Sequence, residues 1–133
     1  MSHRIYNRRV DLVTLFSALA DRTRLRILNL MRRREVCVCY FVEILGETQP
    51  KISRHLAYLR RAGLVRTRRD GKWIHYSLAR PADPQTGAVL EATLDAAAKE
   101  KEMRSDEAAL EQACCAVKLP PELEHAPRPQ LTT

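Results

Sequence analysis

Apolar residues in the first third of the chain recur every three or four positions, which is the spacing of amphipathic helices. One such helix is predicted over residues 10–20, with its apolar side formed by Leu12, Val13, Phe16, Leu19 and Ala20. A second is predicted to follow Asp21, a favourable N-cap, and to end in basic residues. Residues 35–45 are apolar almost all round and are predicted to form a third, buried helix that Gly46 closes.

A fourth helix is predicted to begin at Thr48 or Gln49, with Pro50 in its first turn, where the missing N–H has no cost. At 100° per residue the helix separates into an apolar stripe and a polar face. The stripe consists of Ile52, Leu56, Leu59 and Gly63. The polar face and its flanks offer candidate contacts to DNA bases and phosphates, which are Gln49, Lys51, Ser53, Arg54, His55, Tyr58 and Arg61.

After Gly63 the period changes from helical to two, which is typical of β-strands. Two runs of strand-forming residues flank an Asp70-Gly71 pair, a strong hairpin signal. The tip is basic, and Arg68, Arg69 and Lys72 are candidate contacts to phosphates. The predicted fold is therefore mainly α with a small β-hairpin: a winged helix-turn-helix.

The remaining chain is predicted to contain one long helical stretch over residues 83–115, broken near Arg104 and Ser105. A stripe on this stretch could face a second copy of the chain; it consists of Val89, Leu90, Leu94, Ala97 and Ala98. Residues 118–133 contain four prolines and are predicted to be a disordered tail. We therefore expect one domain over residues 1–117 and a tail over 118–133.

The distribution of charge supports a nucleic-acid partner. The formal net charge is +7 and the pI is about 9.6. Residues 51–72 carry many cations and the single acid Asp70, whereas residues 83–124 are mainly acidic. A basic region of this kind, at the predicted reading helix and hairpin, favours double-stranded DNA as the partner.

Length and composition exclude several classes. The 133 residues suffice for about one domain, and 45% hydrophobic content supports one modest core. The longest uncharged apolar run, residues 36–42, is far shorter than the roughly 18 residues of a membrane span. We expect a cytoplasmic protein without a membrane partner. In a reducing cytosol the pairs Cys37/Cys39 and Cys114/Cys115 indicate metal or metalloid ligation, or redox sensing.

The run VCVCYFVEILGETQPKISRHLAYLRRAGLVRTRRDGKWIHYSL closely resembles the arsenic-responsive repressors of the ArsR/SmtB family. The resemblance covers about residues 11–80 and does not extend to the end of the chain. It implies a homodimeric repressor that pairs through its first and last helices and binds a palindromic operator. It also implies release from the operator by trivalent arsenic (arsenite) or antimonite, and no organic cofactor.

The resemblance also implies three sulfur ligands for trivalent arsenic. The related repressors carry the pattern CVCxxC, and Val42 occupies the third cysteine position here. On a regular helix Cys37 and Cys39 would point about 200° apart, so ion binding would have to deform the predicted third helix.

Several ways to complete the ligand set remain open. Cys114 or Cys115 could supply the third sulfur, from the same or the other protomer. The tail pair could instead be the main site, or a small exogenous thiol or hydroxide could complete Cys37 and Cys39. All four thiols together would suit cadmium or lead.

A thiol-redox repressor of the same fold is another alternative. An enzyme is not expected, because the chain has neither a phosphate-binding loop nor a catalytic constellation.

Overall fold

The computed structural model describes residues 10–132 and contains four helices before the hairpin. These are α2 (Leu12–Leu19), α3 (Arg22–Met31), α4 (Val38–Leu45) and α5 (Gln49–Arg61). Their boundaries follow from local chemistry, because the side chains of Asp11, Asp21 and Thr48 each accept the hydrogen bond of a first-turn backbone N–H. Gly46 ends α4 in the left-handed region, at φ 67°, where the absence of a Cβ removes the steric penalty. The predicted caps Asp21 and Gly46 are confirmed, and α5 begins at Gln49, one of its two predicted starts.

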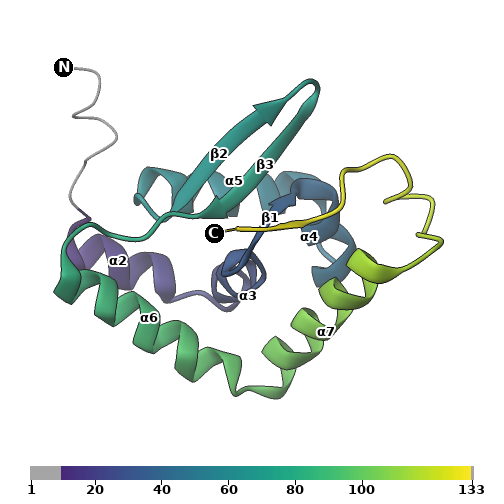
Figure 1. Ribbon diagram of the computed structural model, residues 1–133. Coiled ribbons are helices and arrows are strands. Elements are labelled where there is room, and N and C mark those ends of the chain that lie inside the picture. Colours follow the sequence, from purple (N-terminus) through teal and green to yellow (C-terminus); the bar gives the residue numbers. More distant parts are fainter. Residues whose placement is uncertain (1–9, 133) are drawn as a thin grey trace.

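The wing is an antiparallel hairpin of β2 (Val65–Asp70) and β3 (Trp73–Leu78) that rises from the helical body (Figure 1). Asp70 pairs with Trp73, so the connecting turn consists of Gly71 and Lys72 alone. Gly71 has φ 62°, a conformation that a two-residue hairpin turn requires at its first central position. The predicted winged helix-turn-helix is confirmed.

The prediction of a third helix over residues 35–45 is wrong for its first residues. Residues 34–37 form a strand, β1 (Arg34–Cys37), and α4 begins only at Val38. Val36 pairs with Tyr76 and Cys37 with His75, so β1 adds a strand to the wing sheet. Periodicity could not show this, because an apolar segment this short has no distinct helical or strand period. The free edge of β3 provides the hydrogen bonds that decide the conformation.

The long C-terminal stretch is divided into α6 (Pro84–Ala98) and α7 (Lys101–Cys115). The break falls at Lys99 and Glu100, not at the predicted Arg104–Ser105. Both helices pack against α3, and in Figure 1 they form a bent arm along the lower side of the molecule. Leu90, Leu94 and Ala97 of the predicted dimer stripe are buried within the protomer. Their burial removes most of that stripe as a surface for a partner.

The predicted disorder of residues 118–133 is not what the structure shows for residues 118–132. Leu123 and Ala126 of this segment are buried in the core. Residues 130–131 form β4 (Gln130–Leu131), which pairs antiparallel with β1 and extends the sheet to the order β2-β3-β1-β4. The prolines therefore shape a chain that the core and a sheet edge hold in place, which composition alone could not reveal.

The face of α2 that points away from the core is apolar. Leu12, Val13 and Phe16 are exposed, with 50%, 73% and 54% of their surface accessible. Such a cluster is typical of a surface that a partner covers. Among the described residues, no helix is both long and apolar enough to cross a membrane.

Candidate DNA interface and thiol cluster

The outer face of α5 is a basic surface. Ile52, Leu56 and Leu59 anchor the helix in the core, which turns the opposite side outward. The exposed side chains on that opposite side are Gln49, Ser53, Arg54, Tyr58 and Arg61. The positive end of the helix dipole at the start of α5 also favours a phosphate nearby.

One basic residue beside this surface escaped the sequence analysis. The guanidinium of Arg24, on α3, lies 4.2 Å from the centre of the Tyr58 ring and donates to the carbonyls of Ala18 and Ser17. The two hydrogen bonds hold the Arg24 guanidinium in place over the Tyr58 ring. A hollow of about 440 Å³ joins them to α5; its lining residues are Arg24, Lys51, Arg54, His55, Ala57, Tyr58 and Arg61. No signal within α5 could have found Arg24, because only the packing of α3 brings it there.

Two of the predicted contacts already have protein partners. The ammonium of Lys51 forms an ion pair with Glu47, one turn earlier. The imidazole of His55 lies 3.9 Å from the Asp21 carboxylate, and burial lowers the pKa of His55. We therefore expect Lys51 and His55 to interact mainly with these carboxylates and not to contact DNA bases.

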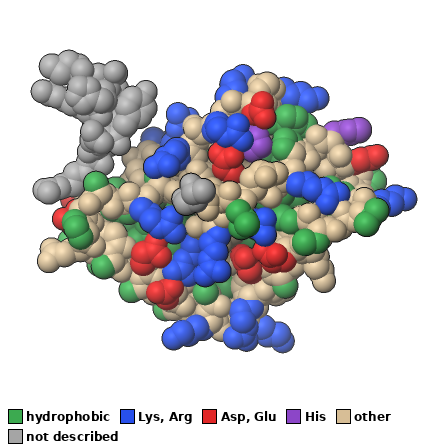
Figure 2. Space-filling view, in the orientation of Figure 1, with side chains coloured by type: hydrophobic (Ala, Val, Ile, Leu, Met, Phe, Trp, Pro, Cys, Tyr) green, Lys and Arg blue, Asp and Glu red, His purple; other side chains and the backbone are tan. Residues whose placement is uncertain are grey.

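The three candidate cations of the wing differ in whether they have an acidic partner. Arg68 donates to both carboxylate oxygens of Glu35, at 3.0 and 2.8 Å, and this ties β2 to β1. The same pair lowers the pKa of Glu35 below its ordinary value. Arg69 is exposed, and the Lys72 ammonium lies 5.3 Å from the Trp73 ring at the tip. Figure 2 shows Lys and Arg side chains at the upper end of the molecule, where the hairpin ends, and further groups of them at the centre and the lower edge.

The first cysteine pair lies at the junction of β1 and α4. Cys37 is buried and occupies the N-cap position of α4 with an extended backbone, at φ −88° and ψ 161°. Cys39 is half-buried in the first turn. The two residues are thus not both helical, and the expectation that ion binding must unwind a helix between them is wrong in its premise. Burial raises the pKa of the Cys37 thiol to about 11, so this group is protonated at neutral pH.

The two cysteines of the second pair differ in their exposure to solvent. Cys114 is half-buried near the end of α7, and its Sγ lies 3.8 Å from the carbonyl oxygen of Pro129. Cys115 is exposed. The Cys37 Sγ lies at the same distance, 3.8 Å, from the carbonyl oxygen of Pro127. Residues 127–129 therefore contact both Cys37 and Cys114, whereas Cys115 is exposed.

Tyr40 is a buried polar group beside these thiols. Its hydroxyl has no hydrogen-bond partner among the described residues. Burial raises the pKa of Tyr40 to about 12. Tyr40 was not among the predicted site residues, although its place next to Cys39 was a usable signal. In the described part of the chain, no three Cys, His, Asp or Glu side chains converge closely enough to hold a metal ion.

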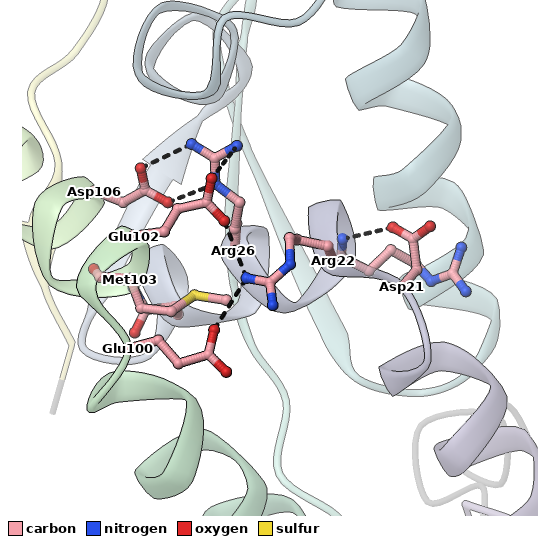
Figure 3. Close-up of polar contacts among 9 residues, drawn as sticks. Asp21, Arg22, Arg26, Glu100, Glu102, Met103 and Asp106 are labelled. Carbon is pink, nitrogen blue, oxygen red and sulfur yellow. Dashed lines mark hydrogen bonds and ion pairs between the residues drawn. The ribbon is translucent and has the colours of Figure 1, made fainter.

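A network of ion pairs fixes α7, and with it Cys114, against α3 (Figure 3). The guanidinium of Arg26 donates to both oxygens of the buried Asp106, at 2.8 and 2.9 Å. Arg22 reaches Glu100 and Glu102, and the side-chain amide of Asn29 donates to the backbone carbonyl of Met103. The position of Cys114 is thus set by contacts between helices that lie far apart in the sequence.

Comparison with known proteins identifies the family of this chain. The family described as "Bacterial regulatory protein, arsR family" matches residues 21–67. The "Arsenical resistance operon repressor" of Escherichia coli (strain K12) is 52% identical over 68 residues, which cover 50% of this chain and 58% of that protein. The "Arsenic resistance transcriptional regulator ArsR2" of Pseudomonas putida is 41% identical over 83 residues, or 62% of this chain and 72% of that protein. This chain belongs to the arsR family.

The fold agrees with this assignment. The solved structure of HlyU from Vibrio cholerae N16961 superposes with a TM-score of 0.52 at 36% identity, over 60% of this chain and 84% of that one. The family and these relatives are transcriptional regulators and not enzymes. The chain spans less than two thirds of the Escherichia coli repressor, 58% of its length. Cys114, Cys115 and residues 118–132 lie outside the residues matched by the family model.

Proposed function

We propose that this protein is a repressor that binds operator DNA as a homodimer and is released when trivalent arsenic or antimony binds cysteine thiols. The observation that carries the DNA-binding part is the exposed cationic face of α5 beside a basic wing. A recognition helix of this kind enters the major groove while the wing contacts the neighbouring backbone. The exposed apolar face of α2, formed by Leu12, Val13 and Phe16, supports pairing of two copies.

We further propose that Cys37, Cys39 and Cys114 supply the three sulfur ligands. Soft thiolates suit a thiophilic metalloid. Cys37 and Cys114 contact the same segment, residues 127–129, and Cys39 lies two residues from Cys37 in the first turn of α4. Val42 leaves the third position of the first motif without sulfur, and Cys114 replaces it. A single-residue test is whether Cys114→Ser raises the arsenite concentration needed to release DNA.

The same observations favour a metalloid over the two alternatives. Cadmium or lead would be best served by four converging sulfurs, whereas Cys115 is exposed and Cys37 is buried. Redox sensing needs an accessible reactive thiol, and Cys37, at the junction with α4, is buried. We accordingly propose a cytoplasmic repressor whose thiols stay reduced until the ion arrives.

The two tail cysteines should behave differently. Replacing Cys114 by Ser is expected to raise the arsenite concentration for half-release of operator DNA at least about tenfold, equivalent to about 1.4 kcal/mol. Cys115→Ser, the matched control one residue away, should respond like the wild type. A mobility shift over an arsenite titration measures both. Equal responses of the two variants would contradict the assignment of Cys114 as a ligand.

DNA affinity should depend on individual basic residues of α5 and the wing. Arg54→Ala is expected to weaken operator binding by about 1–3 kcal/mol and to relax selectivity, because Arg54 lies where a recognition helix reads bases. Arg69→Ala should weaken all sequences alike and make the salt dependence shallower by about one charge. Fluorescence anisotropy at several salt concentrations gives both quantities. Lys101→Ala, an exposed cation at the start of α7, should change neither; equal losses at all three positions would indicate nonspecific charge attraction.

A further inference from the structure

Residues 118–132 form a segment, here called the strap, that contacts the thiols of Cys37 and Cys114. Leu123 and Ala126 anchor the strap in the core, with 2% and 7% of their surface exposed. The Arg128 guanidinium donates to the carbonyl of Cys114, at 3.2 Å. At its far end the backbone N–H of Thr132 donates to the carbonyl of Arg33, at 2.8 Å. The strap thus connects the end of α7 to the start of β1.

The strap contacts one thiol from each of two distant elements, Cys37 at the start of α4 and Cys114 near the end of α7. Its carbonyl oxygens at Pro127 and Pro129 accept from Cys37 and Cys114, and each contact uses the proton of the thiol. A sulfur that binds an ion has exchanged this proton for the ion, so it has no proton to donate. The carbonyl oxygen that it contacted then has no donor and loses its hydrogen bond.

The strap is also linked to the wing indirectly, through Glu35 of β1. Gln130 of β4 pairs with Glu35 of β1, and Glu35 holds Arg68 of β2 with both carboxylate oxygens. Arg34 adds a second link, because its guanidinium donates to Pro129 of the strap and to Glu111 of α7. The edge strand β4 is only two residues long, so it has few hydrogen bonds to resist displacement.

We infer that the strap caps the resting thiols, and that ion binding displaces it and so disturbs β1 and the Glu35–Arg68 contact with the wing; this regulation rests on the function proposed above. In the reaction, arsenous acid and three thiols give one tris-thiolate and three water molecules. Three S–H and three As–O bonds break, three S–As and three O–H bonds form, and no atom is oxidised or reduced. For Cys37 and Cys114 to bind one ion, both thiols must give up their hydrogen bonds to residues 127–129.

Hydrogen exchange on the full-length protein tests the displacement directly. The Thr132 amide is expected to exchange about tenfold faster or more when arsenite is bound, because its hydrogen bond to Arg33 is lost. The Leu25 amide, which donates to Asp21 within the α3 cap at 3.0 Å, is the internal control and should not change. In the Cys37→Ser protein arsenite should change neither amide.

Two variants that leave all four cysteines in place test the coupling. Ala126→Asp places a charge in the buried anchor of the strap, and His125→Asp makes the same change at its exposed neighbour. Ala126→Asp is expected to be released from DNA at an arsenite concentration at least about threefold lower than the wild type. His125→Asp should match the wild type. Thr132→Pro removes one strap hydrogen bond without touching the core, so it provides the same test if Ala126→Asp does not fold.

The outcomes separate this inference from the proposed function. If arsenite releases the wild type while the Thr132 amide keeps its protection, the ion is sensed without moving the strap and the inference is overturned. Wild-type release concentrations in both Ala126→Asp and Thr132→Pro would overturn it as well. If arsenite does not release the wild type at all, the proposed function fails and the strap mechanism fails with it.

Discussion

Replacing Cys37 by Ser is expected to give a protein that binds operator DNA normally and is no longer released by arsenite. Cys37 is central to the proposed site because it lies at the junction of β1 and α4, beside the helix that precedes the recognition helix. Serine keeps the shape of the side chain and can donate to Pro127 as the thiol does, but its oxygen does not replace a soft sulfur ligand. We expect the arsenite concentration for half-release to rise by about a hundredfold or more, equivalent to about 2.7 kcal/mol.

A mobility shift with arsenite, together with urea unfolding of the variant, measures this effect. The control is Cys115→Ser, which removes an exposed thiol and should leave release unchanged. Normal release of Cys37→Ser would contradict the ligand role of Cys37. Loss of DNA binding without arsenite would instead show that Cys37 is needed for the fold.

Replacing Asp106 by Ala is expected to lower the free energy of unfolding by about 2–4 kcal/mol. Asp106 is 5% exposed and accepts two hydrogen bonds from Arg26, whose side chain is 18% exposed (Figure 3). Removing the carboxylate leaves a largely buried cation without its partner, and this penalty exceeds the net value of the pair itself. The partial exposure of Arg26 places the expected loss below that of a fully buried pair.

Urea unfolding of Asp106→Ala beside Asp95→Ala measures the difference. Asp95 pairs with Arg32, but its side chain is 66% exposed, so its loss should cost less than about 1 kcal/mol. Combining Arg26→Met with Asp106→Leu should recover most of the stability, because no unpaired charge then remains. Equal effects of Asp95→Ala and Asp106→Ala would mean that the Arg26–Asp106 pair does not hold α7 in place.

Several features of this protein could be predicted from local sequence because local chemistry determines them. Local interactions determine the caps Asp21 and Gly46, the apolar stripe of α5 and the Asp70-Gly71 hairpin. The resemblance of residues 11–80 to arsenic-responsive repressors adds the family, which the relatives confirm. The winged helix-turn-helix and the exposed basic side chains of α5 therefore required no tertiary information.

The errors occur where distant segments meet. The strand at residues 34–37 exists because β3 and β4 offer hydrogen bonds on both sides of it, and a helix was predicted there from composition. Residues 118–132 appeared disordered because their proline content hides the contribution of Leu123 and Ala126 to the core. The break between α6 and α7 lies at Lys99 and Glu100, where the chain turns so that both helices pack on α3.

The sequence by itself determined that this chain is a winged helix-turn-helix of the arsR family with a basic reading helix and two pairs of cysteines. Only the tertiary structure distinguished Cys114 from Cys115, placed Cys37 before α4 and showed a strap over the thiols. Caps, turns and amphipathic stripes are interactions between near neighbours, so a linear sequence displays them. The relation of Cys37 to Cys114 depends on ion pairs, a buried strap and a sheet edge contributed by residues 70 or more positions apart.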